Sequence, residues 1–155
     1  MSQHPRDILK ELEGRARRRF GQNFLVAEGA LQQILVCTRL TPESKVLEIG
    51  PGLGALTRVL LSSGAQVRAV EIDRDLAAAL KEKHGPRAQV YAADVLRFDF
   101  KQVLGADAQP LVLIGNLPYN ISTPLLIAIL GQLQVVDRMV FMLQREVAVR
   151  LAAGP

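Results

Sequence analysis

A chain of 155 residues with 22% charged and 49% apolar side chains suits one globular domain and excludes a disordered or fibrous chain. No apolar run approaches the roughly 20 residues that span a bilayer, and the first residues lack the apolar core of a signal peptide. We therefore expect a cytoplasmic protein with no membrane partner. Its single cysteine, Cys37, excludes an internal disulfide, and the sequence predicts no metal site. We expect Cys37 to lie on a buried helix face.

The net charge of +4 is concentrated near the N-terminus, where residues 1–20 carry six basic and three acidic side chains. A helix is predicted in this segment from about residue 7 to residue 18, with Asp7 as its N-cap. Its basic side chains are typical of a segment that contacts phosphates, although a solvated helix face explains the charge equally well. The candidate phosphate contacts are Arg15, Arg17, Arg18 and Arg19.

Further along the chain, the periodicity predicts first one more helix and then a regular α/β alternation. The second helix covers 28–40, where Leu31, Ile34 and Leu35 recur at helical spacing. Strands follow over 46–49, 67–71, 89–92, 111–115 and 138–143, and helices over 55–63, 74–83, 99–104, 123–131 and 144–152. This alternation predicts an α/β fold, a mostly parallel sheet with helices on both faces. We divide the chain into an N-terminal helical segment, 1–44, and a core, 45–155.

The turn Gly50-Pro-Gly-Leu-Gly54 lies between the first strand and its helix, the context expected of a nucleotide-binding turn. Because they lack a Cβ, Gly50, Gly52 and Gly54 allow the main chain to approach a cofactor closely. The third glycine comes one residue earlier than in the dinucleotide fingerprint G-x-G-x-x-G, which favours S-adenosylmethionine over NAD. The alternative is a glycine-rich turn without a ligand.

Ligands of parallel sheets bind beyond the C-terminal ends of the strands, so the residues that follow the next strands are further candidates. Glu71, about 20 residues after the glycines, is placed to accept hydrogen bonds from both hydroxyls of a ribose. Asp73 is expected to cap the following helix. Asp94 can accept the exocyclic amine of an adenine, although an aspartate after a strand is even more typical of a turn or cap.

The segment Asn116-Leu117-Pro118-Tyr119 follows an entirely apolar strand and indicates the reaction. The lone pair of a planar amine such as adenine N6 is delocalised into the ring, so an enzyme must hold the amine with that lone pair directed at the methyl group. The side-chain oxygen of Asn116 and the carbonyl of Leu117 can accept the two N–H protons. Pro118 fixes the backbone, and the ring of Tyr119 can stack on the base. One alternative is an ordinary turn without a catalytic role. Another is a methyltransferase that acts on a DNA adenine or on a protein glutamine side chain.

Five segments in register resemble the ribosomal RNA adenine N6-dimethyltransferase family, from Arg18 to Pro155. They are Arg19-Phe-Gly-Gln-Asn-Phe-Leu25, Val46-Leu-Glu-Ile-Gly-Pro-Gly-Leu-Gly54, Glu71-Ile-Asp73, Gly115-Asn-Leu-Pro-Tyr-Asn-Ile-Ser-Thr123 and Phe141-Met-Leu-Gln-Arg-Glu-Val147. The resemblance implies the Rossmann-like fold of S-adenosylmethionine-dependent methyltransferases and an enzyme with that cofactor. It implies cofactor contacts from Asn23, Leu25, Gly50, Glu71, Asp94 and Asn116. Phe141, by its apolar context a core strand residue, would form a stacking clamp with Tyr119.

Within the family, the fourth and fifth segments look more like the KsgA/RsmA branch than the Erm branch, which more often has isoleucine where Leu117 stands. The resemblance thus implies dimethylation of two adjacent adenosines near the 3′ end of small-subunit (16S) rRNA, a step in ribosome biogenesis. Alternatives are Erm-type methylation of large-subunit rRNA, or a ribosome-assembly or RNA-binding factor whose methylation is secondary. The expected partner is small-subunit rRNA, bound in a salt-dependent way by Arg15, Arg17, Arg18 and Arg19, and we expect a monomer.

Family members continue into two more strands and a small helical domain beyond the position of Pro155. Without those strands, residues 140–143 are expected at or near an exposed sheet edge, which native sheets avoid. We therefore expect this chain to be a fragment or truncation. Its cofactor pocket would be nearly complete and its RNA-binding surface incomplete, so that cofactor binding survives with little or no turnover.

Overall fold

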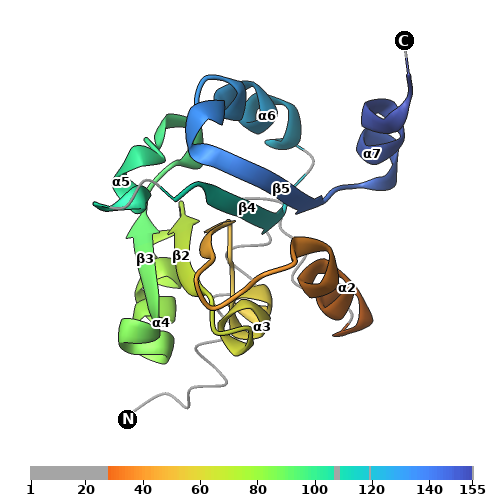
Figure 1. The fold of residues 1–155 in the computed structure, drawn as a ribbon. Helices are drawn as coiled ribbons and strands as arrows, with labels where there is room; N and C mark the ends of the chain where they lie inside the picture. The colour runs from red at the N-terminus through yellow and green to blue at the C-terminus, as the bar shows by residue number, and fades with distance from the viewer. Residues whose placement is uncertain (1–27, 107–108, 119, 155) are drawn as a thin grey trace.

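A sheet of five parallel strands in the order β3-β2-β1-β4-β5 forms the centre of the protein (Figure 1). The computed structural model describes residues 28–106, 109–118 and 120–154. The strands are β1 (Lys45–Ile49), β2 (Gln66–Glu71), β3 (Ala88–Ala92), β4 (Leu111–Asn116) and β5 (Val136–Met142). Every neighbouring pair is parallel, which confirms the predicted sheet.

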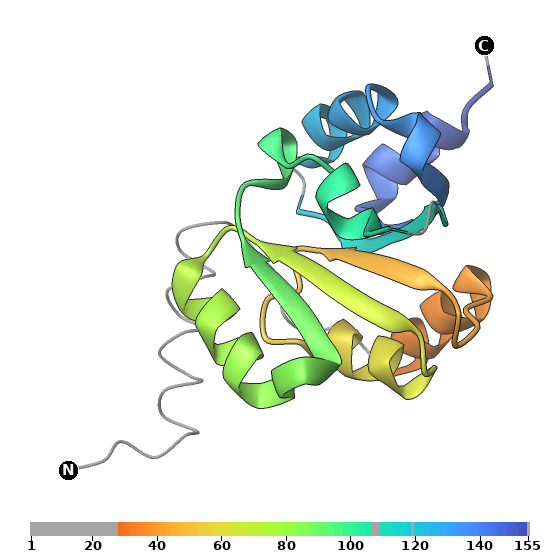
Figure 2. The same ribbon diagram turned by 60° about the vertical axis from the view of Figure 1, so that its left-hand side comes forward.

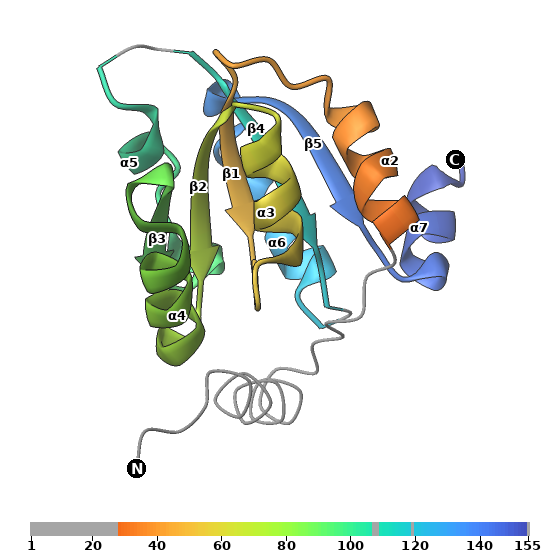
Figure 3. The same ribbon diagram turned by 90° about the horizontal axis from the view of Figure 1, so that it is seen from below.

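Helices cover both faces of this sheet, as the alternation predicted (Figures 2 and 3). They are α2 (Glu28–Thr38), α3 (Ala55–Ser62), α4 (Arg74–His84), α5 (Lys101–Leu104), α6 (Ser122–Leu130) and α7 (Arg145–Ala152). Short 3-10 turns, which were not predicted, lie at η1 (Gly85–Arg87), η2 (Val95–Arg97) and η3 (Leu133–Val135). The predicted bounds agree within two residues, and the helix predicted over 7–18 lies outside the described residues.

Successive side chains of a strand point to opposite faces, so the buried central strands feed two separate cores. On one face, Leu47 and Ile49 pack with apolar side chains from η2, α5 and α6. On the other face, Val46 packs with Val112 and with side chains of α2 and α3. β1 and β4 are buried almost throughout, which agrees with the mostly apolar sequences of the two strands.

The helix α2 is tied to the rest of the molecule at both ends. At its N-terminus, the carboxylate of Glu28 accepts a hydrogen bond of 3.0 Å from the guanidinium of Arg58 in α3. At its C-terminus, Arg138 of β5 donates from Nε to the carbonyl of Thr38 at 2.9 Å and from Nη2 to the carbonyl of Arg39 at 3.3 Å. A guanidinium thus satisfies carbonyls that end a helix without an intrahelical partner.

The prediction that Cys37 lies on a buried helix face is wrong, because the residue is exposed. The buried stripe of α2 runs through Leu31, Ile34 and Thr38, and Cys37 lies off that stripe beside the exposed Val36. Apolar neighbours in sequence were misleading here, since adjacent helical residues point in different directions. The prediction for the sheet edge is confirmed: among the described residues, β5 pairs with β4 alone. Within the same ranges, no helix has the length and apolarity needed to cross a membrane.

Candidate active site

The glycine turn after β1 holds three backbones in the left-handed region, with φ of 64° at Gly50, 57° at Gly52 and 85° at Gly54. A Cβ added to Gly50 would meet no atom within 4 Å, so its outer side is open to a ligand. A Cβ on Gly54 would come within 2.6 Å of Leu80 Cδ2 in α4. The first glycine therefore permits close approach of a ligand, whereas the third permits close packing of two helices.

Glu71 ends β2 as a fully buried carboxyl that braces the glycine turn. Its Oε2 accepts a hydrogen bond of 2.9 Å from the amide of Gly52, and its Oε1 accepts one of 3.0 Å from the amide of Asp73. Each oxygen retains a second lone pair, so both can also accept from a ligand hydroxyl. Burial raises the pKa of the Glu71 carboxyl, and hydrogen bonds from backbone amides oppose that rise. Glu71 is thus fixed in position with acceptor capacity to spare.

Asp73 has the capping role that the sequence predicts. Its Oδ1 accepts hydrogen bonds from the amides of Asp75 at 2.9 Å and Leu76 at 3.2 Å, which makes it the N-cap of α4. The cap fixes the backbone immediately after Glu71. The carboxyl of Asp94 likewise accepts a hydrogen bond of 3.0 Å from the amide of Leu96 and caps η2.

A cavity of about 80 Å³ opens where the ends of β1 and β2 meet the turn after β3 and the loop after β4. It brings together four predicted site residues, namely Gly50, Glu71, Asp94 and Pro118. The rest of the lining is mostly apolar and is formed by Ile49, Val70, Ile72, Val95, Leu96, Asn120 and Ile121. Apolar walls with a few carboxylates suit a nucleoside, whose ring faces are apolar and whose edges are polar. Small-molecule sites usually exceed roughly 300 Å³, so this cavity can enclose only part of a nucleoside cofactor.

The loop after β4 is held at both ends by hydrogen bonds. The amide of the buried Leu117 donates to the carbonyl of Met142 in β5 at 3.0 Å. The carbonyl of Pro118 accepts from the amide of Ile121 at 3.2 Å and from the hydroxyl of Ser122 at 3.1 Å. Leu117 and Pro118, two residues of the segment predicted to hold the target base, are thus anchored to β5 and to the start of α6.

Three predicted residues of this region, Asn116, Leu117 and Phe141, do not line the small cavity. Asn116 is half-buried at the last position of β4, and Pro118 rather than Asn116 contributes to the lining. Phe141 is half-buried in β5 opposite Gly115 and packs against the core cluster that contains Leu117. Tyr119, Asn23, Leu25, Arg15, Arg17, Arg18 and Arg19 lie outside the described residues.

One buried acid beneath this site was not singled out from the sequence. Glu48 of β1 is 1% exposed, and its Oε2 accepts a hydrogen bond of 2.6 Å from the hydroxyl of Thr57 in α3. Burial, and to a smaller extent the nearby Glu71 carboxylate, raises the pKa of Glu48 to about 8 against the opposing hydrogen bond from Thr57. Glu48 is therefore protonated at neutral pH. The signal in the sequence was an acidic residue in the apolar run from Val46 to Ile49.

The sheet order and the site at its C-terminal edge define the Rossmann-like fold of S-adenosylmethionine-dependent methyltransferases. The chain belongs to the family described as "Ribosomal RNA adenine dimethylase", whose sequence model matches residues 13–155. The resemblance found in the five segments is thereby confirmed.

Solved structures and curated relatives agree with this family. The structure of "23S rRNA methyltransferase ErmE" aligns with a TM-score of 0.64 and 34% identity over 81% of this chain and 50% of that one. A dimethyladenosine transferase from Plasmodium falciparum aligns with a TM-score of 0.70 and 28% identity over 85% of this chain and 47% of that one.

Among the curated relatives, "Ribosomal RNA small subunit methyltransferase A" of Pseudomonas savastanoi pv. phaseolicola is 49% identical over 150 residues, which are 96% of this chain and 56% of the relative. The protein of the same name from Hahella chejuensis is 51% identical over 142 residues, 90% of this chain and 52% of the relative. The chain spans about half the length of the curated relatives it matches.

Proposed function

We propose that this chain is the methyltransferase portion of an enzyme that transfers methyl groups from S-adenosylmethionine to adenine N6 in small-subunit rRNA. The products would be N6,N6-dimethyladenosines at two adjacent positions near the 3′ end. One observation carries the proposal: the anchored turn Asn116-Leu117-Pro118 lies at the edge of a cavity that also holds Gly50, Glu71 and Asp94. Family membership and the names of the relatives support the same reaction.

The residues of the cavity fit S-adenosylmethionine. The open outer side of Gly50 leaves room for a ligand, and the buried Glu71 has lone pairs free for the two hydroxyls of a ribose. Asp94 lines the same cavity and would accept the adenine amine, while Asn23 and Leu25 would cover the site. The cofactor supplies a methyl group activated by a positively charged sulfonium.

The loop after β4 would position the target base. The side-chain oxygen of Asn116 and the carbonyl of Leu117 would accept the two N–H protons of the adenine amine and thereby orient its lone pair. Tyr119 and Phe141 would hold the base by stacking. Placement of the amine, rather than a strongly basic side chain, would then account for most of the rate.

The proposed partner is small-subunit rRNA, because relatives named for that subunit share 47–51% identity with the chain, against 34% for ErmE. Arg15, Arg17, Arg18 and Arg19 would contact its phosphates, which gives binding that weakens with salt. We further propose that the protein works in the cytoplasm as a monomer, which sedimentation of the purified chain can test.

The test is transfer of labelled methyl groups to unmethylated small and large ribosomal subunits, with the Pseudomonas savastanoi relative in parallel. We expect little or no label from this chain alone, but label in adenosines of the small subunit when the chain is joined to the part of the relative that it does not match. In the joined protein the label should be lost in Asn116→Ala and kept in Gln134→Ala, an exposed position away from the cavity. Label in the large subunit alone would instead favour the Erm-type reaction. Binding of the small subunit by the joined protein without label, where the relative transfers label, would favour a binding factor.

A further inference from the structure

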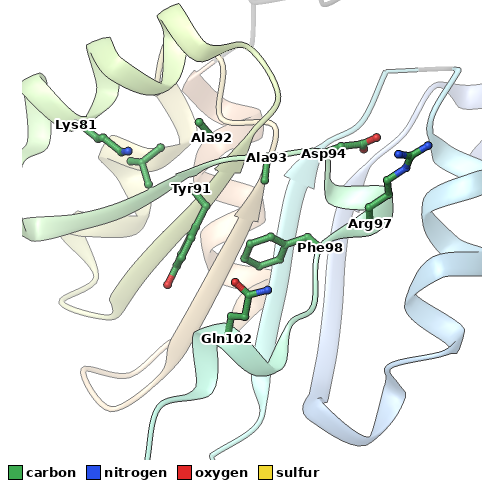
Figure 4. Close-up of a pocket in the computed structure, with 9 residues that line it drawn as sticks. Lys81, Tyr91, Ala92, Ala93, Asp94, Arg97, Phe98 and Gln102 are labelled. Atoms are coloured by element: carbon green, nitrogen blue, oxygen red, sulfur yellow. The ribbon is translucent and has the colours of Figure 1, made fainter.

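A second hollow, separate from the cavity at the strand ends, runs along the outer side of β3. It measures about 630 Å³ and is shown in Figure 4. Within the described ranges β3 pairs with β2 alone, so its other side is a free sheet edge. The lining comes from α4, β3, η2 and α5, and Asp94 lines both this groove and the candidate cofactor cavity. We call this hollow the β3 groove.

The charged side chains of the β3 groove favour an anion. Lys81 lies at one end and Arg97 at the other, with the aromatic rings between them (Figure 4). Neither cation forms an ion pair within residues 28–106, 109–118 and 120–154. The one acidic lining residue, Asp94, already accepts the amide of Leu96. Two unpaired cations at separate points match a ligand with more than one negative group.

The middle of the β3 groove offers an aromatic surface and free backbone groups. The rings of Tyr91 and Phe98 meet edge to face with centroids 5.1 Å apart, and Tyr91 is only half-buried. The amide of Ala93 donates to the carbonyl of Glu71 in β2 at 3.0 Å. Because alternate residues of an edge strand direct their backbone groups to opposite sides, those of the exposed Ala92 point into the groove. The backbone groups of Ala92 therefore lie beside the ring of Tyr91, and both lie between the two cations of the groove.

We propose that the β3 groove binds a single-stranded segment of the substrate RNA, with phosphates on Lys81 and Arg97 and a base against Tyr91. Proteins that bind single strands combine cations that follow the backbone with aromatic rings on which bases stack. An extended acidic peptide would match the charges but would leave the ring without a stacking partner. The proposal rests on the proposed function, since that function supplies the RNA. The β3 groove would give the RNA a second contact beside Asp94, the proposed adenine ligand of the cofactor, in addition to the turn at Asn116.

The test is the salt dependence with which the full chain binds a single-stranded RNA of about 10 nucleotides and mixed sequence. The double variant Lys81→Gln/Arg97→Gln is expected to lower the slope of log affinity against log salt by about 1.4, at about 0.7 for each lost phosphate contact. The matched control is Lys83→Gln/Lys101→Gln, which removes the same charge from exposed neighbours outside the groove. It should change the slope far less. Tyr91→Leu, which keeps an apolar side chain against Phe98, should weaken binding about tenfold.

An unchanged slope in the groove variant, or an equal change in both double variants, would overturn the proposal. Equal competition by a decaglutamate peptide would overturn it too and assign the groove to an acidic protein. Circular dichroism melting of each variant shows whether a loss reflects the groove or the fold. Since RNA binding is measured without methyl transfer, a negative result here leaves the proposed function standing. Absence of labelled methyl transfer when the chain is joined to the unmatched part of the relative, together with a normal slope, would count against that function alone.

Discussion

The hydroxyl of Thr57 in α3 lies 2.6 Å from the carboxyl of Glu48 in β1, between two layers of the fold. Both side chains are almost completely buried, and the pair lies where the helix after the glycine turn packs on the sheet. A buried polar group that loses its partner costs more free energy than the net value of the hydrogen bond itself. The hydrogen bond thus joins α3 to β1, the two elements between which the glycine turn lies.

Replacing Thr57 by valine keeps the shape of the side chain but removes the donor. We expect Thr57→Val to lower the free energy of unfolding by about 1–3 kcal/mol, because the Glu48 carboxyl is left without this partner. Urea unfolding measures the change. Thr57→Ser, which retains the hydroxyl, is the control, and equal stability of the two variants would contradict the role given to the hydrogen bond.

The raised pKa of Glu48 predicts a pH dependence of stability. Below about pH 4.5, its ordinary pKa, the carboxyl is protonated in the folded and the unfolded chain alike. As the pH rises from there to about 8, the unfolded chain releases this proton while the folded chain keeps it, so the free energy of unfolding falls. Above about 8 the effect levels off. At about 1.4 kcal/mol per pKa unit, the loss amounts to several kcal/mol.

Glu48→Gln tests this dependence because glutamine resembles the protonated acid and can still accept from Thr57. We expect the unfolding free energies of the two proteins to diverge progressively between pH 5 and about 8, with the wild type losing more stability. Titrating groups that do not interact with Glu48 are common to both proteins and cancel in the difference. Parallel curves over this range would show that Glu48 titrates normally in the folded state.

Glu71→Gln should weaken the binding of S-adenosylmethionine. Glutamine offers one acceptor oxygen in place of two, and its amide group would face the amide of Gly52 or Asp73, both of which are donors. We expect a loss of about tenfold or more in affinity, measured by calorimetry at fixed pH. Asp75→Asn, which removes an exposed acid in the first turn of α4, is the control. Affinities within about twofold for both variants would argue against Glu71 as the ribose ligand.

Gly115 tests how closely β1 and β4 approach beside the turn that we propose holds the target base. A Cβ at this position would lie 2.7 Å from the carbonyl oxygen of Ile49, a backbone atom that cannot rotate away. We expect Gly115→Ala to destabilise the protein by about 1–3 kcal/mol. Gly29→Ala is the control, because a Cβ there meets nothing within 4 Å in α2 and should leave stability unchanged or up to about 1 kcal/mol higher. Unfolding midpoints in urea that do not separate these variants would contradict the prediction.

Local patterns were sufficient to predict the elements and the strand ends that carry the site. The glycine turn, Glu71 and Asp94 follow buried strands, and parallel strands bring their ends to one edge of a sheet, so the structure gathers them as expected. Asp94 both lines the cavity and caps η2, so the two interpretations of it are compatible.

Features that depend on tertiary packing could not be predicted from local patterns. The pairing of Glu48 with Thr57 depends on how α3 lies over β1. The strand order β3-β2-β1-β4-β5, which creates the β3 groove at a free edge, likewise follows from how the helices pass over the sheet. None of these has a periodicity that a single sequence displays.

The contact of Arg138 with the end of α2 joins residues that are 100 positions apart in the chain. At roughly 5–20 residues per second, a ribosome adds those residues in about 5–20 s. During that interval the nascent α2 has its apolar stripe and the ion pair of Glu28 with Arg58 to hold it, and the carbonyls of Thr38 and Arg39 lack the guanidinium. The carbonyls at the C-terminus of α2 gain their hydrogen bonds from Arg138 only when β5 is synthesised and joins β4.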